Sequence, residues 1–130
     1  MKEPVWLLRA ALQILHDLSI AEHGGAPGLR DEGLFESALA RPQNLFAYEG
    51  DVDLARRAAS YAFGLAKNHA FVDGNKRIAF IAAATFLKLN GQQLVAEQAA
   101  ATLVMLSVAS GAFSEEELAG WIRQHLRPAE

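Results

Sequence analysis

The hydrophobic residues of the chain recur mainly with the period of an α-helix. In residues 4–22 they stand three or four positions apart with polar residues between them, which predicts an amphipathic helix. The positions on its apolar side are Val5, Leu8, Leu12 and Leu15. Residues 24–28, Gly-Gly-Ala-Pro-Gly, interrupt this helix, because glycine is conformationally permissive and proline fixes φ.

A second, shorter helix is predicted over residues 31–40. Asp31 is a suitable N-cap, and Pro42 is expected to end the helix because proline removes a backbone donor. Residues 43–50 lose the helical pattern. They therefore indicate a turn or a small β-hairpin between two helices.

Two helices rich in alanine are predicted after this turn. Asp51 or Asp53 is expected to cap the first, which ends near Asn68. The second covers residues 75–89, and its stretch 78–87 is uncharged, with a single threonine as its only polar residue. Because a helix that is apolar on all sides is normally buried, we expect this one to lie at the centre of the fold.

The last two helices are predicted over residues 96–109 and from Ser114 onward. Ser114 and Glu117 have the spacing of a capping box, in which each side chain bonds the backbone of the other. The expected buried side of the last helix is formed by Leu118, Trp121 and Ile122.

Together these elements predict an all-α fold, a single domain over residues 1–130. About six helices surround the hydrophobic helix 75–89, and a small β-hairpin flap at 43–50 is a further expectation. The chain has 130 residues, of which 52% are hydrophobic and none is cysteine. The missing cysteines exclude a disulfide framework, a thiol nucleophile and a thiolate zinc site.

Charge and hydropathy argue against two classes of binding partner, nucleic acids and membranes. The formal net charge of −3 argues against a generally basic nucleic-acid-binding surface. The longest uncharged stretch, residues 98–114, has 17 residues, whereas a membrane span needs about 20. The first residues, Met-Lys-Glu-Pro, do not resemble an export signal. We therefore expect a cytoplasmic protein with no direct nucleic-acid partner and no membrane partner.

The segment from His69 to Arg77, His-Ala-Phe-Val-Asp-Gly-Asn-Lys-Arg, differs from the rest of the chain. It concentrates charged and polar groups at the start of the most apolar helix. The first amides of a helix lack partners and carry partial positive charge, so they attract anions. Cations are unfavourable in a first turn, and Lys76 and Arg77 therefore suggest a bound phosphate.

Two other residues of this segment suit phosphate chemistry. His69 has an imidazole that could take a proton from a substrate hydroxyl, since imidazole titrates near neutral pH. Asp73 supplies oxygen ligands that could hold Mg²⁺ on a nucleotide or orient the nucleophile. Each residue also has a purely structural explanation: a helix end for His69, a turn for Asp73, an N-cap for Asn75 and a solvated patch for the cations. His16, His23 and His125 have no metal-site spacing and are expected at the surface.

The nine residues resemble the signature of the Fic/Doc family, His-x-Phe-x-[Asp/Glu]-[Gly/Ala]-Asn-[Gly/Lys]-Arg. The matching positions are His69, Phe71, Asp73, Gly74, Asn75 and Arg77. The resemblance extends to residues 24–31 and 39–43 and covers roughly residues 5–126. It implies a Fic-type helical bundle.

Two positions make the chain similar to the Doc toxin branch of that family. AMP-transferring members carry glycine in place of Lys76 and a second arginine in place of Phe80. The Doc resemblance implies a toxin of a type II toxin–antitoxin system, a kinase that moves the γ-phosphate of ATP to a threonine of elongation factor Tu and blocks translation. A nucleotidyl (AMP) transferase and an inactive module that only binds an antitoxin remain as alternatives.

The resemblance also implies roles for the residues of the site. His69 would be the general base and Asp73 the Mg²⁺ ligand or orienting residue, while Gly74, Asn75, Lys76 and Arg77 would bind the nucleotide phosphates. Tyr48, in the expected hairpin, is a candidate contact for the target chain. The inhibitory motif [Ser/Thr]-x-x-x-Glu-[Gly/Asn] of many Fic proteins does not occur in the sequence. Control is therefore expected from a small, Phd-like antitoxin whose disordered tail folds on binding.

Overall fold

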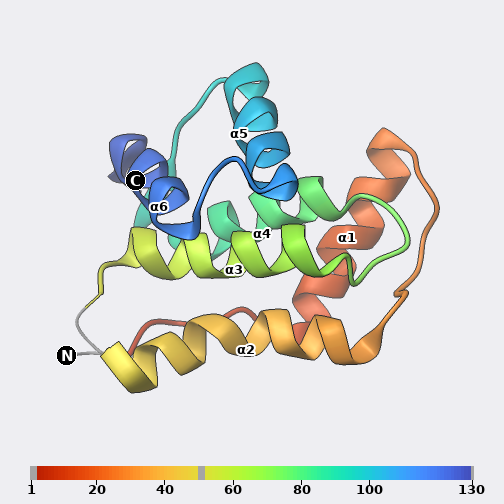
Figure 1. Cartoon of the computed structure of the whole chain (residues 1–130), viewed down its shortest axis with the longest axis horizontal. Coiled ribbons are helices and arrows are strands. Elements are labelled where there is room, and N and C mark those ends of the chain that lie inside the picture. The colour runs from red at the N-terminus through yellow and green to blue at the C-terminus, as the bar shows by residue number, and fades with distance from the viewer. Residues whose placement is uncertain (1–2, 50–51, 130) are drawn as a thin grey trace.

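A computed structural model describes residues 3–49 and 52–129, and within these residues it contains six helices and two short strands (Figure 1). In chain order they are α1 (Arg9–His23), α2 (Glu32–Glu49), α3 (Leu54–Asn68), α4 (Asn75–Leu89), β1 (Gln92–Leu94), α5 (Gln98–Ser110), α6 (Glu115–Gln124) and β2 (Leu126–Pro128). The predicted mostly helical fold is confirmed.

The centre of the bundle is α3 rather than the more apolar α4. Helix α3 contacts α2, α4, α5 and α6, and Figure 1 shows α2 and α6 on opposite sides of it. Alanines, one serine and one glycine make up most of its buried positions, so neighbouring helices approach it on several sides. Helix α4 leaves Phe80 and Ile81 partly exposed. Helix α4 is therefore less buried than its uninterrupted apolar sequence predicted.

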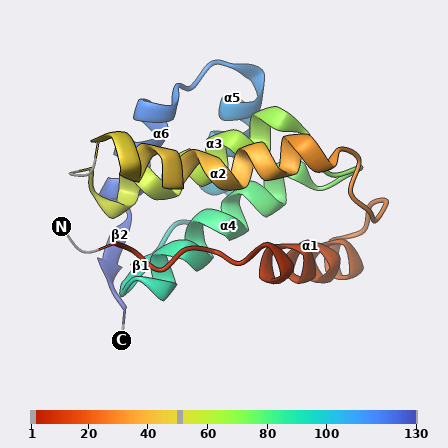
Figure 2. The ribbon, with the colours of Figure 1, turned by 90° about the horizontal axis from the view of Figure 1, so that it is seen from below.

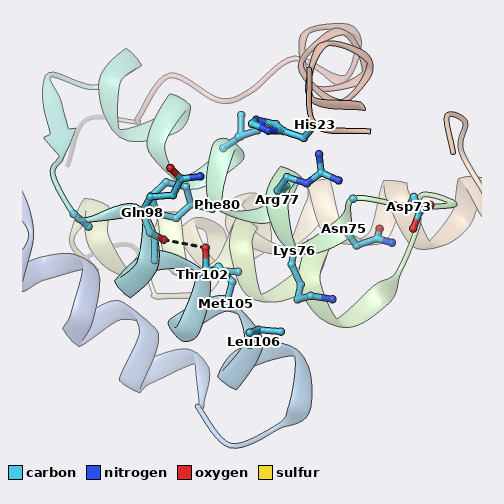
Figure 3. Close-up of a pocket in the computed structure, with 14 residues that line it drawn as sticks. His23, Asp73, Asn75, Lys76, Arg77, Phe80, Gln98, Thr102, Met105 and Leu106 are labelled. Atoms are coloured by element: carbon cyan, nitrogen blue, oxygen red, sulfur yellow. Dashed lines mark hydrogen bonds between the residues drawn. The ribbon is translucent and has the colours of Figure 1, made fainter. Parts of the chain in front are cut away.

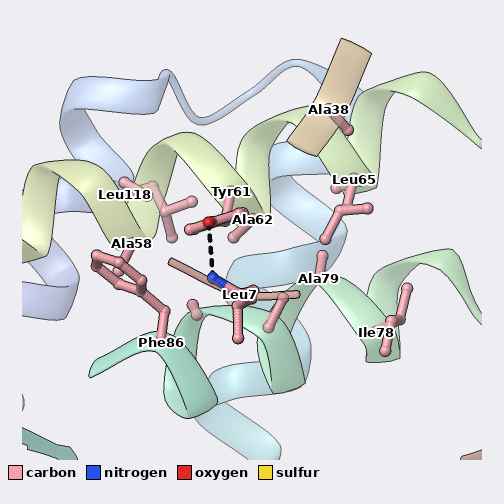
Figure 4. Packing of buried hydrophobic residues seen from close by; sticks show 14 of the residues in the cluster. Leu7, Ala38, Ala58, Tyr61, Ala62, Leu65, Ile78, Ala79, Phe86 and Leu118 are labelled. Atoms are coloured by element: carbon pink, nitrogen blue, oxygen red, sulfur yellow. Dashed lines mark hydrogen bonds between the residues drawn. The ribbon is translucent and has the colours of Figure 1, made fainter. Parts of the chain in front are cut away.

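The core lies mainly between α3 and α4 (Figure 4). Tyr61 of α3 is fully buried and packs against Phe86 of α4, with ring centroids 5.2 Å apart. The hydroxyl oxygen of Tyr61 accepts a hydrogen bond of 3.1 Å from the backbone N–H of Leu7. Burial raises the pKa of the Tyr61 phenol, so the ring stays neutral at physiological pH.

The first helix begins five residues later than predicted. The backbone before α1, which includes Val5 and Leu7, is an extended segment (Figure 2). Side chains from far along the chain hold it there. Asn90 exchanges two hydrogen bonds with the backbone of Val5, and Tyr61 accepts one from Leu7. These long-range bonds replace the helical bonds that the periodic pattern suggested.

The predicted end of α2 at Pro42 and the hairpin flap at 43–50 are both wrong. Helix α2 continues through Pro42 to Glu49. An internal proline costs about 3 kcal/mol. Here the extra turns also bury apolar surface, because Phe46 packs edge-on against Trp6 at 5.9 Å and lies beneath the guanidinium of Arg57 at 4.8 Å. That tertiary packing offsets the cost of the proline.

Three predicted caps are confirmed. The carboxylate of Asp31 accepts from the N–H of Leu34, that of Asp53 accepts from Arg56, and Ser114 forms the capping box with Glu117. The alternative cap, Asp51, lies outside the described residues. The sheet is antiparallel and pairs residues 92–94 with 126–128, a pairing that the pattern did not predict. Among the described helices, none combines the length and apolar character needed to cross a membrane.

Candidate active site

The loop at residues 69–74 joins α3 to α4. It begins at His69, which ends α3 in the left-handed conformation with φ 51° and ψ 49°. The His69 carbonyl accepts a hydrogen bond of 2.8 Å from Nε of Arg30. The His69 side chain is exposed, and its ring makes no hydrogen bond to another described residue. The backbone is therefore fixed, while the imidazole stays available.

Residues 24–31, here called the strap, join α1 to α2 and run alongside this loop. The backbone N–H groups of Arg30 and Asp31 both donate to the carbonyl of Ala70, and the N–H of Val72 donates to the carbonyl of Gly28 at 3.0 Å. Leu29 and Phe71 form an isolated antiparallel bridge. The strap therefore holds the loop as a neighbouring β-strand would.

Asn75 closes the loop from its other end. Its side chain accepts from the N–H of Phe71 and donates to the carbonyl of the same residue, both at 3.0 Å. Phe71 is buried against Phe35, with ring centroids 5.1 Å apart. The amide of Asn75 thus has a structural task, and the ring of Phe71 anchors the loop in the core.

Asp73 is held at both its side chain and its backbone. Its Oδ2 accepts a hydrogen bond of 2.9 Å from the N–H of Ala26, and its carbonyl lies 2.7 Å from Nε2 of His16. The strap approaches closely here, because a Cβ on Gly25 would lie 3.3 Å from the Cβ of Asp73. Oδ1 has no hydrogen-bond partner in the described chain, so this oxygen remains free for a cation or a water.

Helix α4 begins without a side-chain cap and without an acidic residue in its first turn. Gly74 precedes it in the left-handed conformation, with φ 74°. The first helical backbone bond runs from the N–H of Ile78 to the carbonyl of Gly74. The N–H groups of residues 75–77 therefore have no partner among the described residues and can bind an anion.

The two cations of this turn are held differently. Lys76 is exposed and forms no ion pair with a described residue. Arg77 donates to the carbonyls of Ser19 and Gly24, at 3.2 and 3.1 Å, at the end of α1. A guanidinium has five N–H donors, so three remain for another acceptor. Figure 3 shows Arg77 on the side of His23 and Lys76 pointing away from it.

A cavity of about 680 Å³ opens in front of this turn (Figure 3). Its polar end is formed by five of the predicted site residues, Asp73, Gly74, Asn75, Lys76 and Arg77. Its apolar end is formed by α4 and α5 and includes Phe80, Ile81, Met105 and Leu106. The volume suits a drug-sized ligand. The cavity therefore combines an anion-binding end with an apolar end.

The other two predicted site residues lie outside this cavity. His69 precedes Asp73 on the same loop but does not line the cavity. Tyr48 is 91% exposed near the end of α2 and lines a separate shallow hollow beside Asn44 and Arg56. The predicted hairpin that would have carried Tyr48 is absent, because residues 43–49 are helical.

The cavity offers few acidic side chains that could bind a metal ion. The described residues contain no cluster of three or more His, Cys, Asp or Glu side chains suited to a metal ion. Within the described part of the chain, Asp73 is the only carboxylate that lines the cavity. This arrangement fits Mg²⁺ carried on a nucleotide, because that ion is usually held by one or two carboxylates together with phosphates and water.

The residues that hold the loop were not predicted from the sequence. His16, expected at the surface, is 1% exposed and bonds the Asp73 carbonyl. Arg30 and the backbone of Ala26 were not singled out either. The resemblance at residues 24–31 was the one signal that pointed to the strap.

Comparison with known proteins agrees with this geometry. A family model described as the Fic/DOC family matches residues 6–87, which include α1 to α3, the strap, the loop and most of α4. The chain belongs to the Fic/DOC family. It is 37% identical over 116 residues to the protein kinase doc of Escherichia phage P1, an alignment that covers 89% of this chain and 91% of that protein.

A second relative supports the same branch of the family. The chain is 48% identical over 75 residues to the toxin Doc of Mycolicibacterium smegmatis, which covers 57% of this chain and 58% of that protein. The chain is therefore a homologue of Doc proteins, and the suspected family is confirmed. The family match ends within α4, so the helix α5 that forms the apolar wall of the cavity lies beyond it.

Proposed function

We propose that this chain is a Doc-type toxin kinase of a type II toxin–antitoxin system. It transfers the γ-phosphate of ATP to a threonine hydroxyl of an elongation factor similar to elongation factor Tu, which blocks translation. The observation that carries the proposal is the start of α4, where the unpartnered amides of residues 75–77 and the unpaired Lys76 border a cavity that also holds Asp73. The relative named a protein kinase supports the use of ATP.

The proposed roles are those that the family resemblance implies for these residues. The target hydroxyl oxygen attacks the γ-phosphorus, the bond from that phosphorus to the β,γ-bridging oxygen breaks, and ADP leaves. His69, exposed and without a hydrogen bond, accepts the hydroxyl proton. The amides of the α4 start, together with Lys76 and Arg77, bind the phosphate oxygens. Bound Mg²⁺ would supply neutralising charge, and Oδ1 of Asp73 would be its protein ligand.

An antitoxin partner is part of the proposal. A Doc toxin relative supports it, as do exposed apolar residues on α1 and α5, two of the helices that contact α4. Ile14 and Leu18 of α1 are 59% and 60% exposed, and Leu103 of α5 is 65% exposed. Such surfaces suit the apolar side of an amphipathic segment. We expect the toxin to act in the cytoplasm, where ATP and elongation factors are available.

The test compares two labels on ATP. The chain is incubated with purified elongation factor Tu and Mg²⁺, once with γ-labelled and once with α-labelled ATP. The proposal expects γ-label on the factor, lost in His69→Ala and retained in His125→Ala, a control at the end of α6. Circular dichroism checks that both variants fold. Transfer of α-label would instead establish a nucleotidyl transferase, and transfer of neither label would favour an inactive antitoxin-binding module.

A further inference from the structure

A buried histidine lies directly beneath the loop and is not used by the proposed chemistry. His16 of α1 is 1% exposed, and its Nε2 is 2.7 Å from the carbonyl oxygen of Asp73. We propose that His16 is a positioning residue of the transfer reaction, which fixes Asp73 and the start of α4 through this hydrogen bond. The proposal rests on the proposed kinase function for its catalytic readout.

The hydrogen bond determines the protonation of the ring. A carbonyl oxygen only accepts, so the proton must be on Nε2 of His16. Nδ1 is buried and has no hydrogen-bond partner among the described residues. The ring therefore acts on the loop through Nε2, as a donor with one fixed direction.

The ring is also held by stacking. Its centroid lies 3.8 Å from that of Phe71, and the two planes are 15° apart. A phenylalanine at position 16 would keep this stacking and would leave no buried Nδ1 without a partner. Compared with phenylalanine, histidine adds only the N–H that donates to the Asp73 carbonyl. Packing alone therefore does not require a histidine at this position.

The bonded carbonyl belongs to the peptide that joins Asp73 to Gly74, directly before α4. Oδ2 of Asp73 is fixed by the N–H of Ala26, so His16 and the strap hold the backbone and side chain of one residue. The next residue, Gly74, is packed against the same ring, because a Cβ on it would lie 3.6 Å from Nε2 of His16. A shift of the peptide between Asp73 and Gly74 would move both the carboxylate and the first free amides of α4.

The test separates the donor from the packing. His16→Phe keeps the ring and removes the donor, whereas His16→Gln restores an N–H of similar reach. Loss of a group that orients a ligand typically costs about 10- to 100-fold. We expect kcat of His16→Phe to fall by about that factor while the KM for ATP changes by less than about threefold, and His16→Gln to recover most of the lost kcat.

Leu12→Val is the matched control, because Leu12 is fully buried on the same helix and makes no bond to the loop. It should lower the melting temperature and leave kcat unchanged. If His16→Phe keeps kcat within about twofold, His16 has no positioning role. If Leu12→Val lowers kcat as much at the same loss of stability, the effect is structural and the proposal is overturned.

Two measurements remain decisive if the wild-type chain transfers no phosphate, a result that would refute the kinase proposal itself. Imidazole ¹⁵N spectra should show a proton on Nε2 of His16. Amide hydrogen exchange at Phe71 and Val72 should become faster in His16→Phe, while exchange in α3 stays unchanged. Equal loop exchange in the two proteins, or an Nε2 without a proton, would overturn the positioning role.

Discussion

Helices α4 and α6 begin in opposite ways. At α6, Ser114 and Glu117 form a reciprocal capping box, and three acidic residues occupy the first turn. At α4, the residue before the helix is a left-handed glycine without a cap, and the first turn holds Lys76 and Arg77 but no acid. The same chain thus contains one helix start that is capped and acidic and one that is uncapped and basic.

The difference between the two N-terminal ends indicates a different role for each. Acids at a helix N-terminus stabilise it by about 0.3–1 kcal/mol each, and cations there are unfavourable. The α6 start gains this stabilisation, and its Glu115 also pairs with Arg41 and Arg56 of other helices. The α4 start forgoes it and borders the cavity instead. We infer that the residues at the start of α6 stabilise the fold, whereas those at the start of α4 serve to bind an anion.

The largest expected effect comes from the charge next to the α4 start. Asp73→Asn keeps an oxygen that can accept from the N–H of Ala26 but removes the carboxylate charge. Transfer should fall by about 10²- to 10³-fold, the typical cost of losing one electrostatic group at a reacting centre. The melting temperature should stay close to that of the wild type. Phosphate-transfer rates at several Mg²⁺ concentrations test this, and wild-type rates would contradict it.

Exchanging the charges of the two helix starts tests the comparison directly. Lys76→Glu should raise the free energy of unfolding by about 0.3–1 kcal/mol. It should also weaken ATP binding by about 10- to 100-fold, because a charged phosphate contact is replaced by repulsion. Urea unfolding and calorimetric ATP titration measure the two effects.

The matched variant is Glu116→Lys, an exposed position in the first turn of α6. It should lower stability by a similar amount and leave ATP binding unchanged. If both variants change only stability, the α4 start binds no phosphate and the comparison fails.

A smaller effect is expected from the α6 cap alone. Ser114→Ala removes the hydroxyl that accepts from the N–H of Glu117. The free energy of unfolding should fall by about 1 kcal/mol, with phosphate transfer unchanged. Thermal unfolding followed by circular dichroism measures this loss. A fall in transfer at temperatures where the variant is folded would contradict the separation of the two helix ends.

The smallest effect concerns a third helix start, that of α3. The hydrogen bond from Arg123 lowers the pKa of the Asp53 carboxyl, so the ionised form is favoured in the folded chain. This stabilisation is present at neutral pH and is lost as the pH falls through the lowered pKa. Asp53→Asn, which still caps the helix, should be less stable by at most about 1 kcal/mol at pH 7.

That difference should disappear in acid, below the lowered pKa of Asp53. Urea unfolding at a series of pH values, from about pH 7 down through the acid range, measures it. A difference that stays the same over the whole series would show that the pair with Arg123 does not contribute.

Local signals in the sequence predicted the elements that depend on local chemistry. Helix α4 begins at Asn75 and ends at Leu89 as predicted, because the loop before it and the Asn-Gly after it act within a few residues. The caps of α3 and α6 followed from Asp53 and Ser114 for the same reason. The continuation of α2 through Pro42 could not be predicted locally, since Phe46 is held there by side chains from other segments.

The candidate site also contains residues that the local sequence predicted and residues that it could not predict. The order of charged and polar residues from His69 to Arg77 indicated a phosphate site, and five of these residues line one cavity. The residues that shape the loop were not predictable from spacing, because they lie far away in the sequence. His16 has a typical surface-helix neighbourhood, with Gln13 and Asp17 near it, and only the folded chain brings it under Asp73.

The strap has a consequence for the order of folding. The bonds that shape the loop join residues 57 positions apart for His16 and Asp73, 47 for Ala26 and Asp73, and 39 for Arg30 and His69. Contacts of such separation form after local helices, since loop closure costs entropy. The anion site is therefore a late product of folding. A local opening of residues 24–31 would abolish it while the helices persist, so the candidate site is expected to be less stable than the fold.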